Sequence, residues 1–134
     1  MGSSTLWPES FEGQGYLSTD SSVSSFANWT KIVLGYCDGA LHQGNNPSPV
    51  SYKDTKLYFR GAAITRSHFD WINTKFPFAQ AQKIILTGGS AGGVGTFLWN
   101  NYFIDYVKKP DIVHSIPDSG VFLNVKTITG DNKI

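Results

Sequence analysis

The sequence predicts an α/β fold with a mainly parallel sheet flanked by helices. Short apolar runs of β type alternate with longer amphipathic segments along residues 31–116. Such alternation is typical of a parallel sheet with right-handed crossover connections. A glycine-rich turn, TGGSAGGVG at residues 87–95, joins one of the strands to the helix after it. The composition fits a packed domain, because 40% of the 134 residues are hydrophobic and only 16% are charged.

The first part of the chain predicts an irregular segment followed by strands. Residues 1–28 are rich in serine, glycine and other turn formers, and we expect them to be an irregular segment of the same domain. Residues 31–37 (KIVLGYC) are almost continuously apolar, which predicts a buried strand. A polar loop then extends to residue 49, and residues 56–59 (KLYF) predict a second short strand.

The second part predicts a helix, a strand, a helix and a further strand. Apolar residues at helical spacing predict a helix over 62–76, which Pro77 ends. The apolar run 83–86 predicts the strand before the glycine-rich turn. The next helix runs to about Lys108, before Pro110, and its aromatic residues on several faces predict a helix buried all round. Residues 112–116 predict the last strand.

The glycine-rich turn contains a G-x-S-x-G motif, GGSAG at residues 88–92. Between a strand and a helix, this motif forms the nucleophile elbow of serine hydrolases, which makes Ser90 the candidate nucleophile. We expect Gly88 and Gly92 to remove the crowding that side chains would cause in so tight a turn. The backbone N–H of Ala91, at the positive end of the helix dipole, is the candidate oxyanion donor. The motif fits neither of the common phosphate-binding loops.

The composition excludes several other functions. A net charge of +1 gives no electrostatic basis for binding nucleic acid or an anionic membrane. No apolar run has the roughly 20 residues needed to span a bilayer, and the first residues lack the pattern of a signal peptide. The single cysteine excludes an internal disulfide and a multi-cysteine metal site, and we expect neither metal nor cofactor.

The chain resembles the pectinacetylesterase/Notum family of carboxylesterases. Five blocks carry the resemblance: the segment from Trp29 through 36–39 (YCDG), residues 57–61 (LYFRG), the strand 83–86, residues 89–93 (GSAGG) and residues 118–123 (DSGVFL). The resemblance implies that residues 1–134 are a partial α/β-hydrolase domain that is truncated at both ends. It also implies a metal-free, secreted or extracellular enzyme that acts on an acylated carbohydrate or an acylated protein.

Transferred onto this sequence, the resemblance makes Ser90 the nucleophile and Ala91 its neighbouring oxyanion donor. It also implies that the catalytic acid and histidine lie beyond Ile134, so that the chain alone is close to inactive. His42, His68 and His114 all precede the position of the catalytic histidine in this fold. We expect His114 to be a packed strand residue and His68 to lie on a helix surface.

Three charged residues are candidates for structural roles at the edge of the site. Asp118 follows the last predicted strand, where α/β sheets place their chemistry, but it lies one strand too early for the catalytic acid. Asp38 and Arg60 follow two predicted strands at the same end of the sheet, where they form either a buried ion pair or separate solvated charges. The resemblance allows Cys37 a disulfide partner outside this chain.

The sequence thus predicts a serine carboxylesterase fragment that forms an acyl-serine intermediate at Ser90. Two alternatives stay open: a non-catalytic carbohydrate- or lipid-binding module with the same fold, and an inactive truncated gene product. Asn28 begins the sequon Asn28-Trp29-Thr30, a candidate N-glycosylation site if the chain enters the secretory route.

Overall fold

The computed structural model describes residues 3–122, 126, 129 and 130 of the chain. These residues divide into two compact units, residues 1–37 and residues 38–134. The prediction that all 134 residues form one domain stays a prediction. Leu123, the last residue of the family-like block at 118–123, lies outside the described residues.

The first unit contains little regular structure. Its only described elements are two short 3-10 helices, Ser4–Leu6 (η1) and Gly15–Leu17 (η2). The predicted strand at residues 31–37 is wrong, since the structure assigns no strand there and leaves Val33 53% exposed. A strand exists only where a neighbour supplies backbone hydrogen bonds. An apolar run shows a tendency to be buried but does not provide that neighbour.

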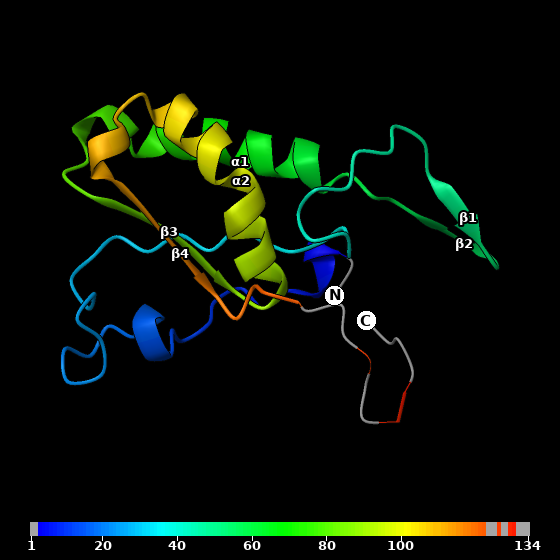
Figure 1. The fold of residues 1–134 in the computed structure, drawn as a ribbon, viewed down its shortest axis with the longest axis horizontal. Coiled ribbons are helices and arrows are strands. Elements are labelled where there is room, and N and C mark those ends of the chain that lie inside the picture. The colour runs from blue at the N-terminus through cyan, green and yellow to red at the C-terminus, as the bar shows by residue number, and fades with distance from the viewer. Residues whose placement is uncertain (1–2, 123–125, 127–128, 131–134) are drawn as a thin grey trace. The chain divides into compact units, whose positions relative to one another are not determined.

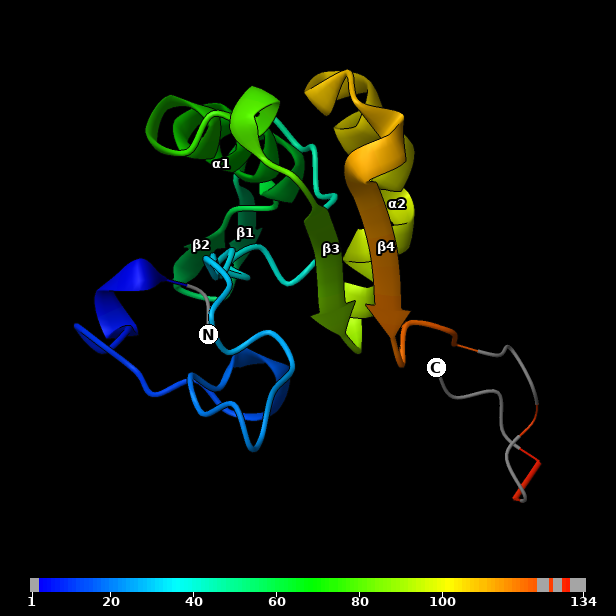
Figure 2. The same ribbon diagram turned by 90° about the vertical axis from the view of Figure 1, so that its left-hand side faces the viewer.

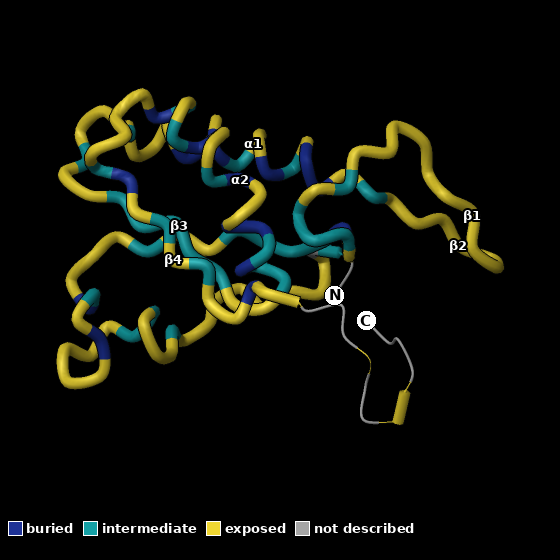
Figure 3. The backbone as a smooth tube through the Cα atoms, in the orientation of Figure 1, coloured by how far each residue is buried: buried dark blue, intermediate teal, exposed yellow. Residues whose placement is uncertain are grey.

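The second unit begins with a small antiparallel hairpin, formed by β1 (Val50–Tyr52) and β2 (Thr55–Leu57). All six strand residues are exposed, and the hairpin extends away from the helices (Figures 1 and 3). The predicted strand at 56–59 is therefore partly confirmed by β2. The partner strand β1 was not predicted, because it follows Pro47 and Pro49 in a segment with the composition of a loop.

Two helices and a parallel strand pair form the rest of the unit. Helix α1 (Gly61–Lys75) is followed by the 3-10 helix η3 (Phe78–Gln80), strand β3 (Ile84–Gly89), helix α2 (Ala91–Val107), the 3-10 helix η4 (Pro110–Ile112) and strand β4 (Val113–Asp118). Strands β3 and β4 run parallel and side by side, as Figure 2 shows, with Ile84 opposite Val113 and Gly89 opposite Asp118. These elements confirm the predicted order of helix, strand, helix and strand.

The core of the second unit lies where α1 meets α2. The Phe69 ring of α1 is 2% exposed and packs against Trp99 and Phe103 of α2, with ring centroids 6.0 and 4.8 Å away. The prediction that α2 is buried all round is wrong, because Phe97 is 54% and Leu98 is 49% exposed. Apolar side chains on every face of a helix favour its burial. They do not determine how many neighbours the helix has.

Candidate active site

Ser90 lies at a sharp turn between the parallel strand β3 and helix α2. Strand β3 ends at Gly89 and α2 begins at Ala91, so that Ser90 alone makes the connection. Its backbone has φ 53° and ψ −114°, a combination that residues with a side chain rarely adopt. The prediction that Ser90 follows a parallel strand and directly precedes a helix is confirmed. Strand, strained residue and helix together have the geometry of a nucleophile elbow.

Steric crowding explains one of the two elbow glycines. A Cβ atom added to Gly88 would lie 2.6 Å from the carbonyl carbon of Gly92, closer than real atoms approach. At Gly92, in contrast, an added Cβ would meet no atom within 4 Å, so the prediction that a side chain there would crowd the turn is wrong. The crowding has one direction, because the backbone of Gly92 occupies the space into which a side chain of residue 88 would point.

The geometry of the turn suits attack on a carbonyl group. Ser90 is exposed, so a substrate can reach its hydroxyl. Ala91 is the first residue of a 17-residue helix, and the first N–H groups of a helix have no partner within it. The positive end of the helix dipole lies at the same place and favours negative charge. An oxyanion that forms beside Ser90 would therefore meet both an N–H donor and a favourable field.

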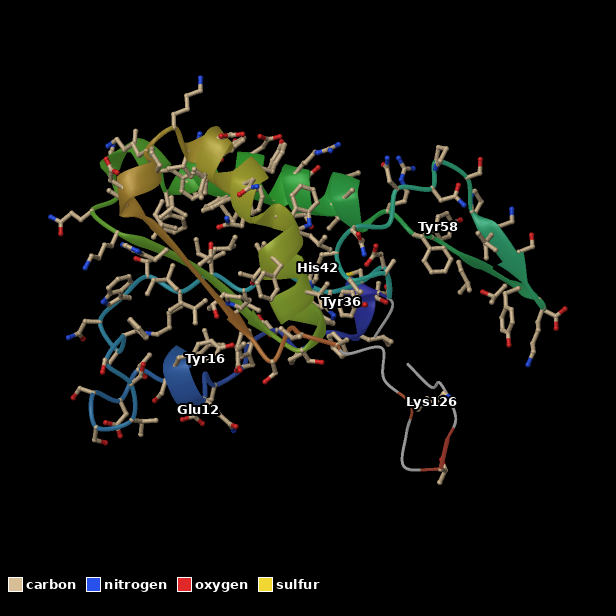
Figure 4. The ribbon with its side chains drawn as sticks, in the orientation of Figure 1. Glu12, Tyr16, Tyr36, His42, Tyr58 and Lys126 are labelled. Carbon is tan, nitrogen blue, oxygen red and sulfur yellow. The ribbon has the colours of Figure 1, made fainter. Side chains whose placement is uncertain are left out.

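The three histidines lie on different elements. The His42 ring packs against the first turns of α2, where its Cδ2 atom would be 3.2 Å from a Cβ added to Gly95 (Figure 4). His68 lies on α1, where it is partly buried. His114 is exposed on β4, where burial alternates along the strand, so the prediction that it is packed is wrong. Within residues 3–122, 126, 129 and 130, no histidine forms a hydrogen bond with the Ser90 hydroxyl.

Burial changes the acid–base behaviour of two histidines. It lowers the pKa of His42 below the ordinary value of 6.5, and His68 adds to this shift while the Asp38 carboxylate opposes it. Burial also lowers the pKa of His68. Both side chains are therefore held in the neutral form to lower pH than they are in the unfolded chain.

The lowered pKa values predict a loss of stability in mild acid. The unfolded chain binds a proton more strongly than the folded chain, so the contribution of each histidine is complete above about pH 6.5 and is lost as the pH falls. We expect the thermal midpoint to fall between about pH 7.5 and about pH 5.5, and His42→Gln to reduce that fall. Circular dichroism melts over this range provide the measurement. His114→Gln is the control, and an unchanged pH dependence in His42→Gln would contradict the explanation.

Asp38 joins three backbone segments through its carboxylate. Its Oδ1 atom accepts a hydrogen bond from the Ala40 N–H at 3.0 Å. Its Oδ2 atom accepts hydrogen bonds from the N–H groups of Gly44 and Gly61, each at 2.9 Å. The residue is 4% exposed. Gly61 is the first residue of α1, so a carboxylate that lies 23 residues earlier in the sequence caps this helix.

Two glycines leave room for that carboxylate, and sequence analysis missed them. A Cβ atom on Gly44 or Gly61 would lie 2.5 or 2.2 Å from Asp38 Oδ2. Asp38 forms no ion pair with the exposed Arg60 among the described residues, because backbone N–H groups occupy its carboxylate oxygens. The signal in the sequence was a glycine at the start of a helix, where a backbone N–H needs a partner.

Asp118 contacts the elbow through its main chain. Its carbonyl oxygen accepts the Ser90 N–H at 3.0 Å. Its exposed carboxylate accepts a hydrogen bond from the neighbouring Ser119 hydroxyl at 2.9 Å. The structure therefore brings Ser90, Ala91 and Asp118 together at the ends of β3 and β4, while Asp38 lies where α1 begins.

The remaining sequence-based expectations concern a metal site, a membrane-spanning helix, Cys37 and Asn28. The described part of the chain has no cluster of three histidine, cysteine, aspartate or glutamate residues that could hold a metal ion. Within the same residues, no helix combines the length and apolar character needed to cross a bilayer. Cys37 is a partly buried free thiol. Asn28 is exposed in a turn, as an N-glycan acceptor must be.

The fold and the elbow together are those of the α/β-hydrolase class. The family comparison is more specific: the family model described as pectinacetylesterase matches residues 1–134, so the chain belongs to the pectinacetylesterase family. The chain is 36% identical to pectin acetylesterase 5 of Arabidopsis thaliana over 132 residues, which cover 98% of this chain and 30% of that protein. The resemblance found in the sequence is confirmed.

Animal relatives support the same assignment. The chain is 26% identical over 127 residues to the palmitoleoyl-protein carboxylesterase NOTUM of Schmidtea mediterranea, covering 91% of this chain and 23% of that protein. The crystal structure of the Wnt deacylase Notum from Drosophila superposes with a TM-score of 0.81 at 26% identity, covering 92% of this chain and 37% of that chain. The chain thus spans only about a quarter to a third of the length of these curated relatives.

Proposed function

We propose that this chain is the part of a serine carboxylesterase that carries the nucleophile. The observation that carries the proposal is the strained backbone of Ser90, held between a parallel strand and the N-terminus of a 17-residue helix. Strain of this kind costs about 1–3 kcal/mol and is retained mainly at functional sites. Membership of a family that contains pectin acetylesterases supports the same reaction.

The proposed reaction is acyl transfer through Ser90. The Ser90 oxygen attacks the ester carbonyl carbon and gives its proton to a general base, and the carbonyl oxygen becomes an oxyanion that accepts the Ala91 N–H. The carbon–oxygen bond to the alcohol then breaks, and the alcohol leaves with the proton from the base. Water attacks the acyl-serine, which releases the carboxylic acid and restores the Ser90 hydroxyl. We place the base and its carboxylate in segments outside these 134 residues.

We propose an acylated carbohydrate or an acylated protein as the substrate. One relative is a pectin acetylesterase and another is a palmitoleoyl-protein carboxylesterase, and these names cover a carbohydrate and a protein as the carrier of the acyl group. An acylated carbohydrate and an acylated protein both present a carboxylic ester, so a serine nucleophile in the same elbow can attack either substrate. The acyl group and the alcohol are determined by the surface around Ser90, to which the flanking segments contribute.

Covalent labelling tests the proposal. A longer chain that carries flanking segments on both sides is treated with a fluorophosphonate, and the modified peptide is identified by mass spectrometry. We expect the adduct on Ser90 and none on the exposed Ser119, which lies at the end of the neighbouring strand. Acetylated pectin that is bound without release of acetate, together with an unlabelled Ser90, would instead indicate a non-catalytic binding module.

We further propose that the protein enters the secretory route and carries an N-glycan at Asn28. Asn28 and Thr30 of the sequon are both exposed. Expression in a secreting eukaryotic host should give a protein whose mass falls by one glycan after treatment with a glycosidase. Asn28→Gln should remove this shift, whereas Asn45→Gln, at an exposed asparagine outside any sequon, should keep it. An unmodified secreted protein would contradict the proposal.

A further inference from the structure

The last residue of β4 contacts the candidate nucleophile from the neighbouring strand. The last pair in the parallel register is Gly89 with Asp118. One residue beyond Gly89, the Ser90 N–H donates a hydrogen bond to the carbonyl oxygen of this same Asp118, at 3.0 Å. The position of Ser90 therefore depends on a segment that lies 28 residues later in the sequence.

A close glycine–glycine contact lies beside this hydrogen bond. Gly93, in the first turn of α2, and Gly120, after β4, are both buried. A Cβ on Gly93 would lie 2.4 Å from the Asp118 carbonyl oxygen, and a Cβ on Gly120 would lie 2.5 Å from the Gly93 carbonyl carbon. Neither position tolerates a side chain, because the neighbouring atoms belong to the backbone. The first turn of α2 and the turn after β4 thus touch main chain to main chain.

Both sides of this contact are conformationally strained. Ser90 has φ 53° and Ser119 has φ 50°, in the left-handed region that residues with a side chain seldom adopt. A strained residue keeps its conformation only where the surrounding structure fixes it. Around Ser90, the fixing contacts are its N–H bond to Asp118, the bond from the Val94 N–H to its carbonyl oxygen at 3.1 Å, and the contact between Gly93 and Gly120.

We propose that the turn formed by Asp118, Ser119 and Gly120 is a positioning element for the nucleophile. It fixes the Ser90 backbone and, through Gly93, the start of α2, on which the Ala91 N–H depends. The inference rests on the proposed esterase function. It assigns Asp118 a role through its main-chain carbonyl, which a triad acid would not have.

The experiment compares Gly120→Ala with Asn101→Ala, a control on the exposed side of α2. In the 134-residue chain, amide hydrogen exchange by NMR reports on the Ser90 N–H directly. We expect that amide to exchange at least about tenfold faster in Gly120→Ala, with most amides of α1 unchanged. In the longer chain, kcat for p-nitrophenyl acetate should fall about 10- to 100-fold while KM stays within about twofold, because a small misplacement of reacting groups acts on the chemical step.

A second variant covers the case in which Gly120→Ala does not fold. Ser119→Val places a branched side chain at an exposed residue with positive φ, which strains the turn without filling the contact between the glycines. We expect a smaller change in the same direction. Asp118→Asn should leave the exchange of the Ser90 amide unchanged, because it keeps the main-chain carbonyl.

The outcomes separate this inference from the proposed function. If Ser90 exchange and kcat are unchanged in both turn variants, the positioning role is overturned even though the esterase is active. If Asp118→Asn abolishes kcat without changing Ser90 exchange, Asp118 acts through its carboxylate and the assignment is wrong. If the longer chain shows no esterase activity, the proposed function fails, and the amide exchange alone decides whether the turn positions Ser90.

Discussion

Replacing Asp38 with alanine is expected to lower the free energy of unfolding by about 3–5 kcal/mol. The substitution leaves the N–H groups of Ala40, Gly44 and Gly61 without their acceptor. Hydrogen bonds to a charged group contribute about 1.5–3 kcal/mol each, although the contributions are not additive. Domains are stable by only about 5–15 kcal/mol, so this loss is a large fraction of the total. The thermal midpoint should fall by about 10–20 °C.

The matched control is Asp20→Ala. The Asp20 carboxylate also accepts two hydrogen bonds, from the N–H and the hydroxyl of Ser22, but both partners lie two residues away on an exposed turn. Water replaces such bonds at little cost, so the melting temperature should hardly change. The melting temperature of Asp38→Asn should lie between those of the two alanine variants, because the amide oxygen can still accept a hydrogen bond from the N–H of Gly44 or Gly61. Equal melting temperatures for the two alanine variants would show that the hydrogen bonds of Asp38 to Ala40, Gly44 and Gly61 do not stabilise the fold.

The sequence predicted best those elements that carry their own local signals. Helix α1 was located because apolar residues recur at helical spacing and Pro77 follows, and the observed helix differs from the prediction by one residue at each end. The elbow was located because the G-x-S-x-G motif stands between an apolar run of β type and an amphipathic segment. In both cases the information lies within about fifteen neighbouring residues.

Features that depend on distant partners were missed. Among the described residues, the apolar run at 31–37 has no strand partner, so local composition misjudged it. The role of Gly93 depends on Gly120, which lies 27 residues later and touches it only in the folded chain. A single sequence records which residues are small but does not record what approaches them.

The candidate site shows the same division. Ser90 and Ala91 could be predicted as nucleophile and oxyanion donor because the motif itself suggests these roles. For Asp38, the sequence left open an ion pair with Arg60, whereas the structure has its carboxylate bound to backbone N–H groups. Backbone donors are present at every residue, so no residue type marks them in the sequence. Charged side chains are conspicuous, which biases sequence reasoning toward ion pairs.

The largest expected effect is on ester hydrolysis. The 134-residue chain should hydrolyse p-nitrophenyl acetate weakly at most, because the Ser90 hydroxyl is a poor nucleophile without a general base and no described histidine bonds to it. A longer chain that adds the flanking segments should be faster by roughly three or more orders of magnitude, and Ser90→Ala in that chain should abolish the gain.

Three proteins assayed side by side decide this prediction: the 134-residue chain, the longer chain, and the longer chain with Ser90→Ala. The residual rate of the short chain measures what the Ala91 N–H and the helix dipole contribute alone, since loss of a triad member leaves oxyanion stabilisation in place. Full activity in the short chain would mean that a base lies within these residues, with half-buried His42 the first to replace. Undiminished activity in Ser90→Ala would mean that the strained serine is not the nucleophile and that its strain serves another purpose.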